Sequence, residues 1–418
     1  MDSKDQSKYL FISGIVFPCL RNNVLSNSKV PLQNAVDTFQ LGLIEGLGHN
    51  LNSLDVLNTP FIGAWPLNYK KKMSPKYCEF DYITRGNRKI RIINLQFLNV
   101  IYFKLYSREH VCFKTIIDYC KKFKQYKFIH LIIYSCHLPF LRAAIHAKKY
   151  FNNIRIELII TDLPEFKNDN MPKWKEWLYS YDTHINDKIY KNIDGFILLT
   201  EKMSNKVIFH NQPYEIIEGI YNLSDRIEPS SINFKSPKKI IFYSGTLARR
   251  YNIMSLVEAF MMLNDDNYEL MICGSGSCEE EIKRKSEIDK RIIFKGALLR
   301  SEVLKLQSQA TLLVNPRTNE GEYTMYSFPS KTMEYLGSGV PTLLYKLSGI
   351  PSEYYKYCFT LSDSSVNSLA KKIDFILKLP DDQLKEMGQK AKDFIINNKN
   401  CEKQCKRFIT LLNNVENL

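Results

Sequence analysis

The sequence predicts an α/β protein made of two Rossmann-like, doubly wound domains, each built around a mostly parallel sheet. Apolar strand-like runs alternate with segments of helical periodicity through the first half of the chain. This alternation is typical of parallel sheets that helices cover on both faces. The same alternation restarts at Lys239. Between the halves, residues 223–237 lose the periodicity and contain several serines and prolines, which indicates a linker.

The length of the chain fits this two-domain organisation. With 418 residues, of which 44% are hydrophobic, the chain can bury two ordinary cores. We expect residues 1–222 to form the first domain and residues 238–380 to form the second. The segment 381–418 has helical apolar spacing, and its helices could pack back on the first domain.

The first half contains the elements of one alternating domain. Strands are expected at Tyr9–Ser13, Asn99–Phe103, Phe128–Tyr134, Ile154–Thr161 and Gly195–Leu199. Helices are expected at Leu32–Gly46, Ser107–Lys122, Leu138–Tyr150 and Glu201–Phe209. The piece Asn168–Tyr190 is typical of an inserted amphipathic helix, whose Trp174 and Trp177 could meet a membrane or simply pack.

The second half repeats the pattern with shorter connections. Strands are expected at Lys239–Ser244, Tyr268–Cys273, Arg291–Phe294, Thr311–Asn315 and Thr342–Tyr345. Helices are expected at Ile253–Leu263, Glu279–Ser286 and Ser301–Gln309. A further helix should begin at Pro329, because proline suits the first helical turn.

The composition favours a cytoplasmic protein. The ten cysteines show no paired spacing, which fits a reducing compartment. The first residues contain early acids and an apolar run too short for a signal peptide. No apolar stretch approaches the ~20 residues that a transmembrane helix needs.

The net charge of +14 suggests an anionic partner. A basic surface can hold a protein against anionic lipid headgroups, so we expect a peripheral location at the inner face of the plasma membrane. A generic solvated surface remains the alternative. We expect no nucleic-acid partner, because the sequence carries no nucleic-acid-binding motif and its basic residues are spread along the chain.

The stretch from Glu320 to Pro341 carries the clearest sign of a ligand site. A lysine in the first turn of a helix, as Lys331 would be, is mildly unfavourable unless an anion binds there. Glu334 follows three residues later on the same helix face. Lys331 and the N–H groups near Ser330 could therefore bind diphosphate oxygens, while Glu334 accepts from ribose hydroxyls. The alternative is a solvated Lys–Glu pair.

Two small turns at predicted strand ends could complete this site. Gly245-Thr246-Leu247-Ala248-Arg249-Arg250 follows the first strand of the second domain. Its small residues let backbone N–H groups approach an anion, and its arginines offer forked donors to phosphate oxygens. Gly274-Ser275-Gly276 follows the next strand. Either turn could be an ordinary connection, but the carboxyl ends of parallel strands meet at one sheet edge.

These residues resemble those of a known protein family. The second half resembles the donor-binding domain of family 4 retaining glycosyltransferases, which have the GT-B fold of two domains facing each other across a cleft. The resemblance lies in YSGTLARRYNI (243–253), MICGSGS (271–277) and above all FPSKTMEYLGSGVPTL (328–343). In the first half, TDLPE (161–165), DGFILLTEKM (194–203) and IIEGIYN (216–222) are similar too.

The resemblance implies a hexosyltransferase-type reaction. A sugar would pass from a nucleotide-sugar donor, with a UDP-sugar as first choice, to a polysaccharide or lipid-linked oligosaccharide acceptor. The anomeric configuration would be retained, and no metal or other cofactor would be required. The string at residues 328–343 is typical of bacterial enzymes that build cell-surface polysaccharides, such as capsule or lipopolysaccharide.

The resemblance also assigns roles to single residues. Arg250 and Lys331 would hold the diphosphate, and positive charge there stabilises the leaving group most in the transition state. One residue departs from the pattern, because Tyr326 stands where the family has a glutamate. Glu322 or Glu320 could contact the donor sugar instead. A second departure is Thr246, which stands where an arginine is common.

The first domain offers two further candidates. Asp162 follows a predicted strand and could contact the donor sugar or the acceptor, or it could cap a helix. His137 has a similar position, where a structural histidine is the simpler interpretation.

Two other functions remain open. A sugar-nucleotide epimerase can share the fold, and Tyr326 favours a catalytically silent nucleotide-sugar-binding protein.

Overall fold

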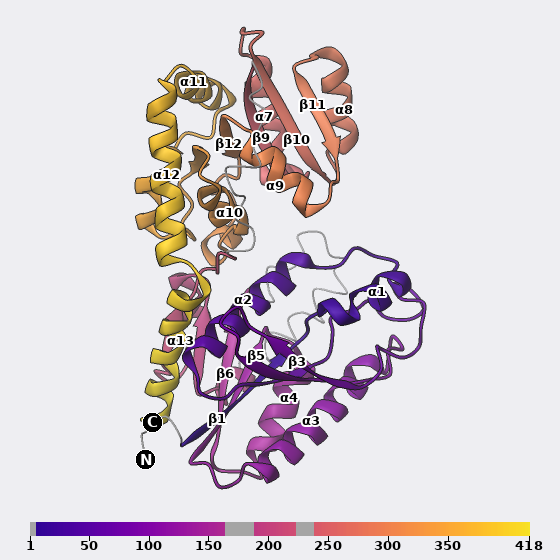
Figure 1. The fold of residues 1–418 in the computed structure, drawn as a ribbon. Helices are drawn as coiled ribbons and strands as arrows, with labels where there is room; N and C mark the ends of the chain where they lie inside the picture. The colour runs from indigo at the N-terminus through magenta and orange to yellow at the C-terminus, as the bar shows by residue number, and fades with distance from the viewer. Residues whose placement is uncertain (1–5, 164–187, 223–237) are drawn as a thin grey trace. The chain divides into compact units, whose positions relative to one another are not determined.

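The computed structural model describes residues 6–163, 188–222 and 238–418. The chain forms two compact units, the first made of Met1–Ile220 with Cys401–Leu418 and the second of Tyr221–Asn400 (Figure 1). Each unit contains a largely parallel sheet with helices, so the predicted fold class is confirmed. The expected linker at 223–237 and the expected helix with Trp174 and Trp177 lie outside the described residues.

The first unit is built on an eight-stranded sheet in the order β3-β4-β2-β1-β5-β6-β7-β8. Only β3 runs antiparallel to its neighbour, β4. The strands are β1 (Ser7–Ser13), β2 (Asp55–Asn58), β3 (Cys78–Ile83), β4 (Lys89–Asn94), β5 (Phe128–Tyr134), β6 (Ile154–Ile160), β7 (Gly195–Leu198) and β8 (Tyr214–Ile216). Five central strands are almost entirely buried runs of branched and aromatic residues, as parallel strands covered on both faces should be.

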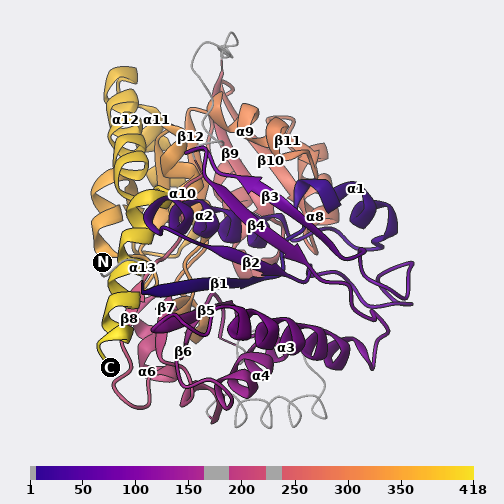
Figure 2. The ribbon, with the colours of Figure 1, turned by 60° about the horizontal axis from the view of Figure 1, so that its bottom comes forward.

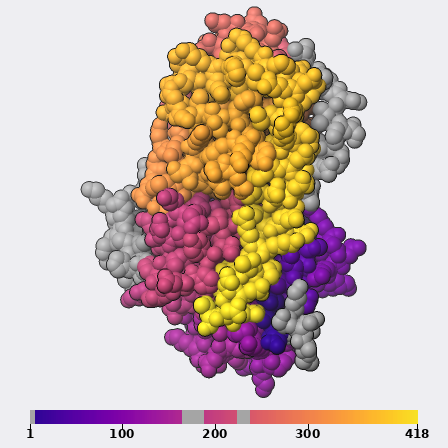
Figure 3. Space-filling view, turned by 90° about the vertical axis from the view of Figure 1, so that its left-hand side faces the viewer, coloured from indigo at the N-terminus to yellow at the C-terminus, as the bar shows by residue number. Residues whose placement is uncertain are grey.

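Helices cover both faces of this sheet. They are α1 (Pro18–Asn27), α2 (Asn34–Asn50), α3 (Lys104–Lys122), α4 (Leu138–Lys148), η3 (Glu201–Met203), α6 (Ser204–Val207) and α13 (Cys401–Glu416). Figure 2 shows α2 on one side of β1, and α3 and α4 on the other. The last helix, α13, joins α2 on its face and adds Phe408, Leu411, Leu412 and Val415 to the core of the first unit. In Figure 3 the C-terminal residues of α13 lie, in yellow, against this unit.

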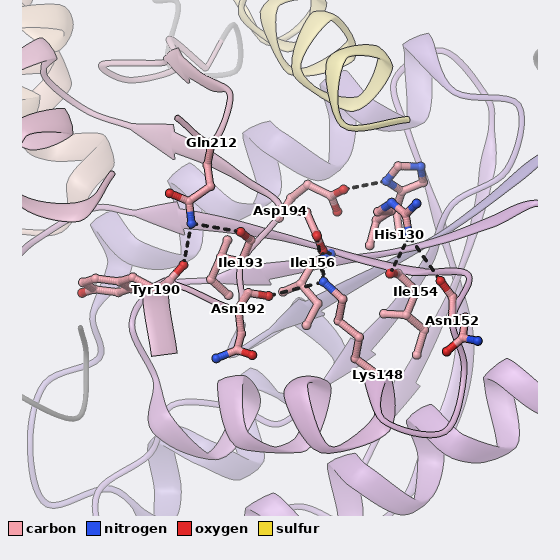
Figure 4. Close-up of polar contacts among 12 residues, drawn as sticks. His130, Lys148, Asn152, Ile154, Ile156, Tyr190, Asn192, Ile193, Asp194 and Gln212 are labelled. Atoms are coloured by element: carbon pink, nitrogen blue, oxygen red, sulfur yellow. Dashed lines mark hydrogen bonds and ion pairs between the residues drawn. The ribbon is translucent and has the colours of Figure 1, made fainter. Parts of the chain in front are cut away.

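A buried polar cluster fastens α13 to the sheet. The Nδ1 of His130 lies 2.6 Å from Glu157 Oε1, and its Nε2 lies 3.0 Å from Glu416 Oε1 on α13. Figure 4 shows His130 in the same region as the ion pair of Lys148 and Asp194. Burial alone lowers the pKa of His130, but the two carboxylates outweigh it and raise this pKa to about 9. The imidazolium therefore links a strand to the final helix.

This cluster predicts a pH-dependent stability. Since the pKa of His130 is about 9 when folded and roughly 6.5 when unfolded, its contribution is complete below the unfolded value and is lost as pH rises toward the folded one. We expect the free energy of unfolding, measured with urea, to fall by roughly 3 kcal/mol over that range. His130→Gln should flatten the fall. The exposed His146→Gln should leave it intact, and an equal fall in both variants would contradict the assignment.

The second unit has a six-stranded, fully parallel sheet in the order β11-β10-β9-β12-β13-β14. Its strands are β9 (Lys239–Thr246), β10 (Tyr268–Ser275), β11 (Ile292–Gly296), β12 (Leu312–Asn315), β13 (Thr342–Tyr345) and β14 (Phe359–Leu361). Strand order reverses direction between β9 and β12. In doubly wound sheets this switch point is where ligands bind, outside the carboxyl ends of the strands.

The helices of the second unit follow its strands in turn. They are η6 (Arg249–Tyr251), α7 (Ile253–Met261), α8 (Glu279–Ile288), α9 (Arg300–Ser308), η7 (Glu322–Tyr326), α10 (Ser330–Ser338), η8 (Ser352–Tyr357), α11 (Val366–Leu377) and α12 (Asp381–Asn398). Apolar residues of α7 and α11 pack on one face of the sheet. Tyr335 of α10 belongs to the core on the other face.

One predicted strand is wrong. Residues 99–103 were expected to form a buried strand, but they form a loop and a turn before α3, which join no sheet and contact the segment of residues 63–72 through a bridge between Trp65 and Val100 and a few backbone hydrogen bonds. The run fails as a strand because Ile101, Tyr102 and Phe103 are exposed to solvent rather than buried. An apolar run alone does not distinguish a core strand from an exposed surface.

Candidate functional site

The two predicted glycine turns lie side by side at the carboxyl edge of the second sheet. β9 and β10 stay paired to their ends, with Gly245 opposite Gly274 and Thr246 opposite Ser275. Their approach is tight, because a Cβ on Gly274 would lie 1.9 Å from the Gly245 carbonyl oxygen. Gly274 also has φ of 141°, which side chains rarely adopt. Only glycine fits this position.

Gly274→Ala should therefore lower the free energy of unfolding by about 2–4 kcal/mol, since it adds both a steric clash and backbone strain. Gly296→Ala is the matched control. Its φ of 66° is also left-handed, but no atom lies within 4 Å of the added Cβ, so it should cost only about 1 kcal/mol. Urea unfolding of both variants measures the difference. Equal losses would show that the turns can separate freely.

The helix α10 begins beside these turns. Pro329 precedes its first residue, Ser330, and the Nζ of Lys331 lies 3.2 Å from Ser244 Oγ at the end of β9. One turn further, the phenol of Tyr335 accepts from the Ser244 backbone N–H (2.8 Å) and donates to the Ser244 carbonyl oxygen (3.2 Å). The helix N-terminus is thereby fixed against the strand end that carries the Gly245 turn.

Glu334 holds two cations at this helix end. Its Oε1 lies 2.6 Å from Lys331 Nζ, and its Oε2 lies 3.1 Å from Arg300 Nη1 on α9. Burial acts to raise the pKa of Glu334, but Lys331 and Arg300 outweigh it, so the pKa is lowered. The Lys–Glu pair considered from the sequence does form. Only 12% of the Glu334 side chain is exposed, however, so this pair is not a solvated one.

Sequence reasoning missed Arg317, which follows β12 at the same sheet edge. Arg317 is buried, and its Nη2 donates to Ser327 Oγ at 2.8 Å. Its guanidinium carbon lies 5.1 Å from the ring centre of Tyr323 and 5.7 Å from that of Tyr251. Burial lowers the pKa of Arg317 and outweighs the phenols of Tyr323 and Tyr251, which act to raise it, while nearby Arg250 adds a small lowering effect.

Within the described residues, no carboxylate is found to influence or pair with Arg317, and its Nε has no hydrogen-bond partner. A buried guanidinium without a counter-ion is costly unless an anion binds to it. The sequence signal was the dipeptide Pro316-Arg317 after a predicted strand, but the chain alone does not show that this arginine is buried. Arg300 was missed for another reason: it is exposed, and only the fold brings it to Glu334.

The predicted glycine-turn residues have different surroundings. Leu247 is fully buried, and its backbone N–H already donates to the Ser275 carbonyl oxygen at 3.0 Å. Arg249 points to α8, where its Nη2 lies 2.5 Å from Glu281 Oε2. Arg250 lies on η6, with its guanidinium 4.9 Å from the Tyr251 ring centre. Of the two arginines, Arg250 is thus the one near Arg317 and the sheet edge.

The loop before α10 holds the candidates for the missing family glutamate. Glu322 begins η7 and Tyr326 ends it. The Tyr326 hydroxyl donates to Glu322 Oε1 at 3.4 Å. The residue that replaces the family glutamate, Tyr326, is therefore a neighbour of the glutamate proposed to take over its role. Glu320 is exposed in the same loop and, after burial and Asp363, adds to the raised pKa of Tyr345.

The two candidates of the first unit also lie beyond strand ends. Asp162 is exposed just after β6, close enough to Tyr134 to help raise the pKa of that buried phenol, which burial itself raises most. His137 precedes α4 and accepts from Arg108 Nη1 at 2.8 Å. Its ring also packs edge-on against Phe61 and Phe140. These contacts support the structural interpretation of His137.

Neither a metal cluster nor a membrane span is found in the part of the chain that the structure describes. No three His, Cys, Asp or Glu side chains converge there as metal ligands would. Among the described helices, none combines the length and apolar character needed to cross a bilayer.

Part of the second unit is similar to a known family. Residues 224–394 match the family model of the glycosyl transferases group 1. This range contains both glycine turns, Arg317 and the whole of α10. The match supports membership of the glycosyltransferase superfamily. Comparison with curated proteins gives no significant match.

Solved structures resemble the whole chain. Sucrose-phosphate synthase from Thermosynechococcus elongatus is 16% identical with a TM-score of 0.66, and the match covers 98% of this chain and 99% of that one. The Anabaena protein HepE in complex with UDP is 11% identical with a TM-score of 0.63, over 97% and 100% of the chains. The E. coli trehalose-6-phosphate structure with UDP-2-fluoro glucose is 11% identical with a TM-score of 0.63, over 98% and 99%. These likenesses show a GT-B fold.

Proposed function

We propose that this protein is a retaining, hexosyltransferase-type glycosyltransferase of the family 4 type, which takes its sugar from a nucleotide-sugar donor. The observation that carries the proposal is the position of Lys331. Its ammonium lies at the N-terminus of α10, 3.2 Å from Ser244 at the end of β9. This is the switch point of the sheet, where a helix N-terminus and a cation together suit a diphosphate.

The residues around this point suit the chemistry of sugar transfer. The bond from the anomeric carbon to the diphosphate oxygen breaks, and its electron pair leaves with the diphosphate. An acceptor hydroxyl bonds to the anomeric carbon, and its proton passes to the departing diphosphate. Lys331, Arg250 and Arg317 would stabilise the charge that grows on the leaving group. These side chains provide the positive charge at the diphosphate, so we expect the reaction to need no metal.

Other residues would position the donor and the acceptor. Glu334 accepts hydrogen bonds only, so it could bind ribose hydroxyls while Arg300 balances its charge. Glu322, with Tyr326 beside it, would contact the donor sugar. Asp162 would act from the first unit, toward the donor sugar or the acceptor. Gly245, Thr246 and Gly274 would let the diphosphate approach the backbone.

The donor proposed is a UDP-sugar. Two of the similar structures, HepE and the E. coli protein, contain UDP or a UDP-sugar analogue. The acceptor proposed is a polysaccharide or lipid-linked oligosaccharide of a capsule or lipopolysaccharide pathway. With its charge of +14, the protein would work in the cytoplasm, peripherally at the inner face of the plasma membrane.

Purified protein incubated with UDP-, GDP- and ADP-sugars would test this function. Slow release of free nucleotide from one donor, accelerated by an acceptor glycan, is the expected result. Interconversion of sugars without nucleotide release would indicate the epimerase instead. The second unit contains no histidine, which disfavours that alternative. Binding without turnover would indicate the silent protein that Tyr326 suggests.

A further inference from the structure

The first unit exposes a compact group of large apolar side chains before and within the first turn of α3. Tyr102 is 87% exposed, Tyr106 72% and Phe103 59%. Exposed apolar residues are normal when scattered singly, but a contiguous group marks an interaction surface. We call this group, together with the exposed Leu67 of the loop before β3, the apolar surface: Leu67, Ile101, Tyr102, Phe103, Leu105 and Tyr106.

The loop of residues 59–77 lies alongside this run. The backbone N–H of Trp65 donates to the Asn99 carbonyl oxygen at 2.8 Å, and that of Ile101 donates to the Trp65 carbonyl oxygen at 3.1 Å. Further along, the Asn99 N–H donates to the Lys72 carbonyl oxygen at 2.7 Å. In Figure 2 the segments before α3 lie at the right-hand side of this unit, beyond the carboxyl ends of β1 and β2.

Buried residues hold the loop of residues 59–77 and the segment before α3 in place. Arg108 is buried, its Nη2 donates to the Pro60 carbonyl oxygen at 2.9 Å, and its guanidinium lies 4.3 Å from the ring centre of Phe97. Tyr69 and Asn99 are also buried, and the Asn99 side chain donates to the Gly63 carbonyl oxygen at 2.8 Å. The exposed aromatic rings therefore belong to loops with a packed interior.

Lysines outnumber acids around the apolar surface, and the flanking Glu79 and Glu109 pair with Arg91 and Arg142. Residues 59–78 contain four lysines and no aspartate or glutamate, and residues 92–108 contain no acid either. Lys70, Lys71 and Lys72 are exposed, and the Lys72 ammonium lies 4.9 Å from the ring centre of Trp65. Apolar and aromatic side chains beside uncompensated lysines match the boundary of an anionic bilayer, where rings lie at the headgroup level.

We propose that the apolar surface and Lys70, Lys71 and Lys72 dock this protein on an anionic lipid bilayer. The inference gives the membrane location proposed above a defined surface, and it rests on that location rather than on sugar transfer. A second copy of the chain is a poorer occupant, since it would bring the same lysines into opposition. A neutral glycan would satisfy the aromatic rings but not the lysines.

Vesicle sedimentation with the full chain, without any nucleotide sugar, tests the proposal. The protein should bind vesicles of phosphatidylcholine mixed with phosphatidylglycerol and leave pure phosphatidylcholine vesicles in solution. Tyr102→Ser, Phe103→Ser and Tyr106→Ser combined should weaken binding at least tenfold. Lys70→Ser, Lys71→Ser and Lys72→Ser combined should weaken it about 100-fold, because each lysine near the surface is worth about a factor of five.

The matched control removes an exposed lysine and aromatic ring elsewhere. Lys372 lies 5.4 Å from the ring centre of Phe375, which is exposed on α11, and Lys372→Ser with Phe375→Ser should bind vesicles like the wild type. Equal binding of all variants would overturn the proposal, as would absence of wild-type binding. So would a wild-type dimer that the aromatic triple variant loses, which would identify an interface between copies. Because no donor is present, failure here leaves the sugar-transfer test unaffected.

Discussion

Replacing Lys331 with alanine should lower kcat for sugar transfer by about 100- to 1,000-fold, the usual effect of removing one fixed donor from a developing negative charge. Lys331 is already held toward the strand end by Ser244 and Glu334. It can contact the departing diphosphate without reorganising. Its loss should therefore lower kcat more than it raises the KM for the donor. Steady-state kinetics with varied donor concentration separates the two effects.

Two variants make the Lys331 result interpretable. Lys378→Ala removes a surface lysine that pairs with Asp374 in the same unit, and it should leave kcat unchanged. Glu334→Ala should also reduce activity without unfolding, but mainly by raising the KM for the donor if Glu334 binds ribose. Wild-type kcat in Lys331→Ala, or a loss equal to that of Lys378→Ala, would remove the role of Lys331.

Arg317→Met should weaken binding of UDP by at least tenfold while leaving the fold as stable as before, or more stable. Methionine has a similar reach but no charge, and replacing a buried charge that lacks a counter-ion is often neutral or stabilising. A diphosphate would lose one buried cation of its site. Calorimetric titration with UDP, together with urea unfolding, measures both quantities on the same preparation.

Arg291→Met should have the opposite effects on stability and on UDP binding. Arg291 is paired with Asp289, with Nη2 2.7 Å from Oδ2, just before β11 begins. Its loss should lower stability because Asp289 loses its partner, but it should leave UDP binding intact. If Arg317→Met lost stability and kept its affinity for UDP, Arg317 would be a structural residue and no part of the anion site.

The second unit could be predicted from sequence in some detail, for local reasons. Its strands are short apolar runs bounded by turns, and its helices begin and end at residues that signal these points. The helix α10 shows this best, since it begins after Pro329 and ends at Gly339, whose φ is 87°. The two glycine turns could be placed at one edge because the strands are parallel, and the pairing of β9 with β10 confirms that placement.

The first unit was predicted less completely. The strands β2, β3 and β4 and the helix α1 were not expected, and neither were β14 and α11 of the second unit. β3 reads CEFDYI and lies antiparallel at one edge of the sheet, where its residues alternate between more and less exposed. Its sequence therefore shows the alternation of a half-exposed strand, but not the continuous apolar run by which the other strands were predicted. Burial of single charges cannot be read from neighbours in sequence, because it depends on distant residues. The burial of Arg317 was therefore out of reach, and so was the contact of the exposed Arg300 with Glu334, which lies 34 residues away in sequence.

The position of α13 has a consequence for how the chain is made on the ribosome. β1 opens the sequence of the first unit, yet α13, which covers that sheet beside α2, follows the entire second unit. During synthesis, the part of the sheet face that packs against Phe408, Leu411 and Val415 stays uncovered. It cannot be covered until some 180 intervening residues (221–400) have been translated. A nascent chain is thus exposed to aggregation or chaperone capture for the whole of that interval.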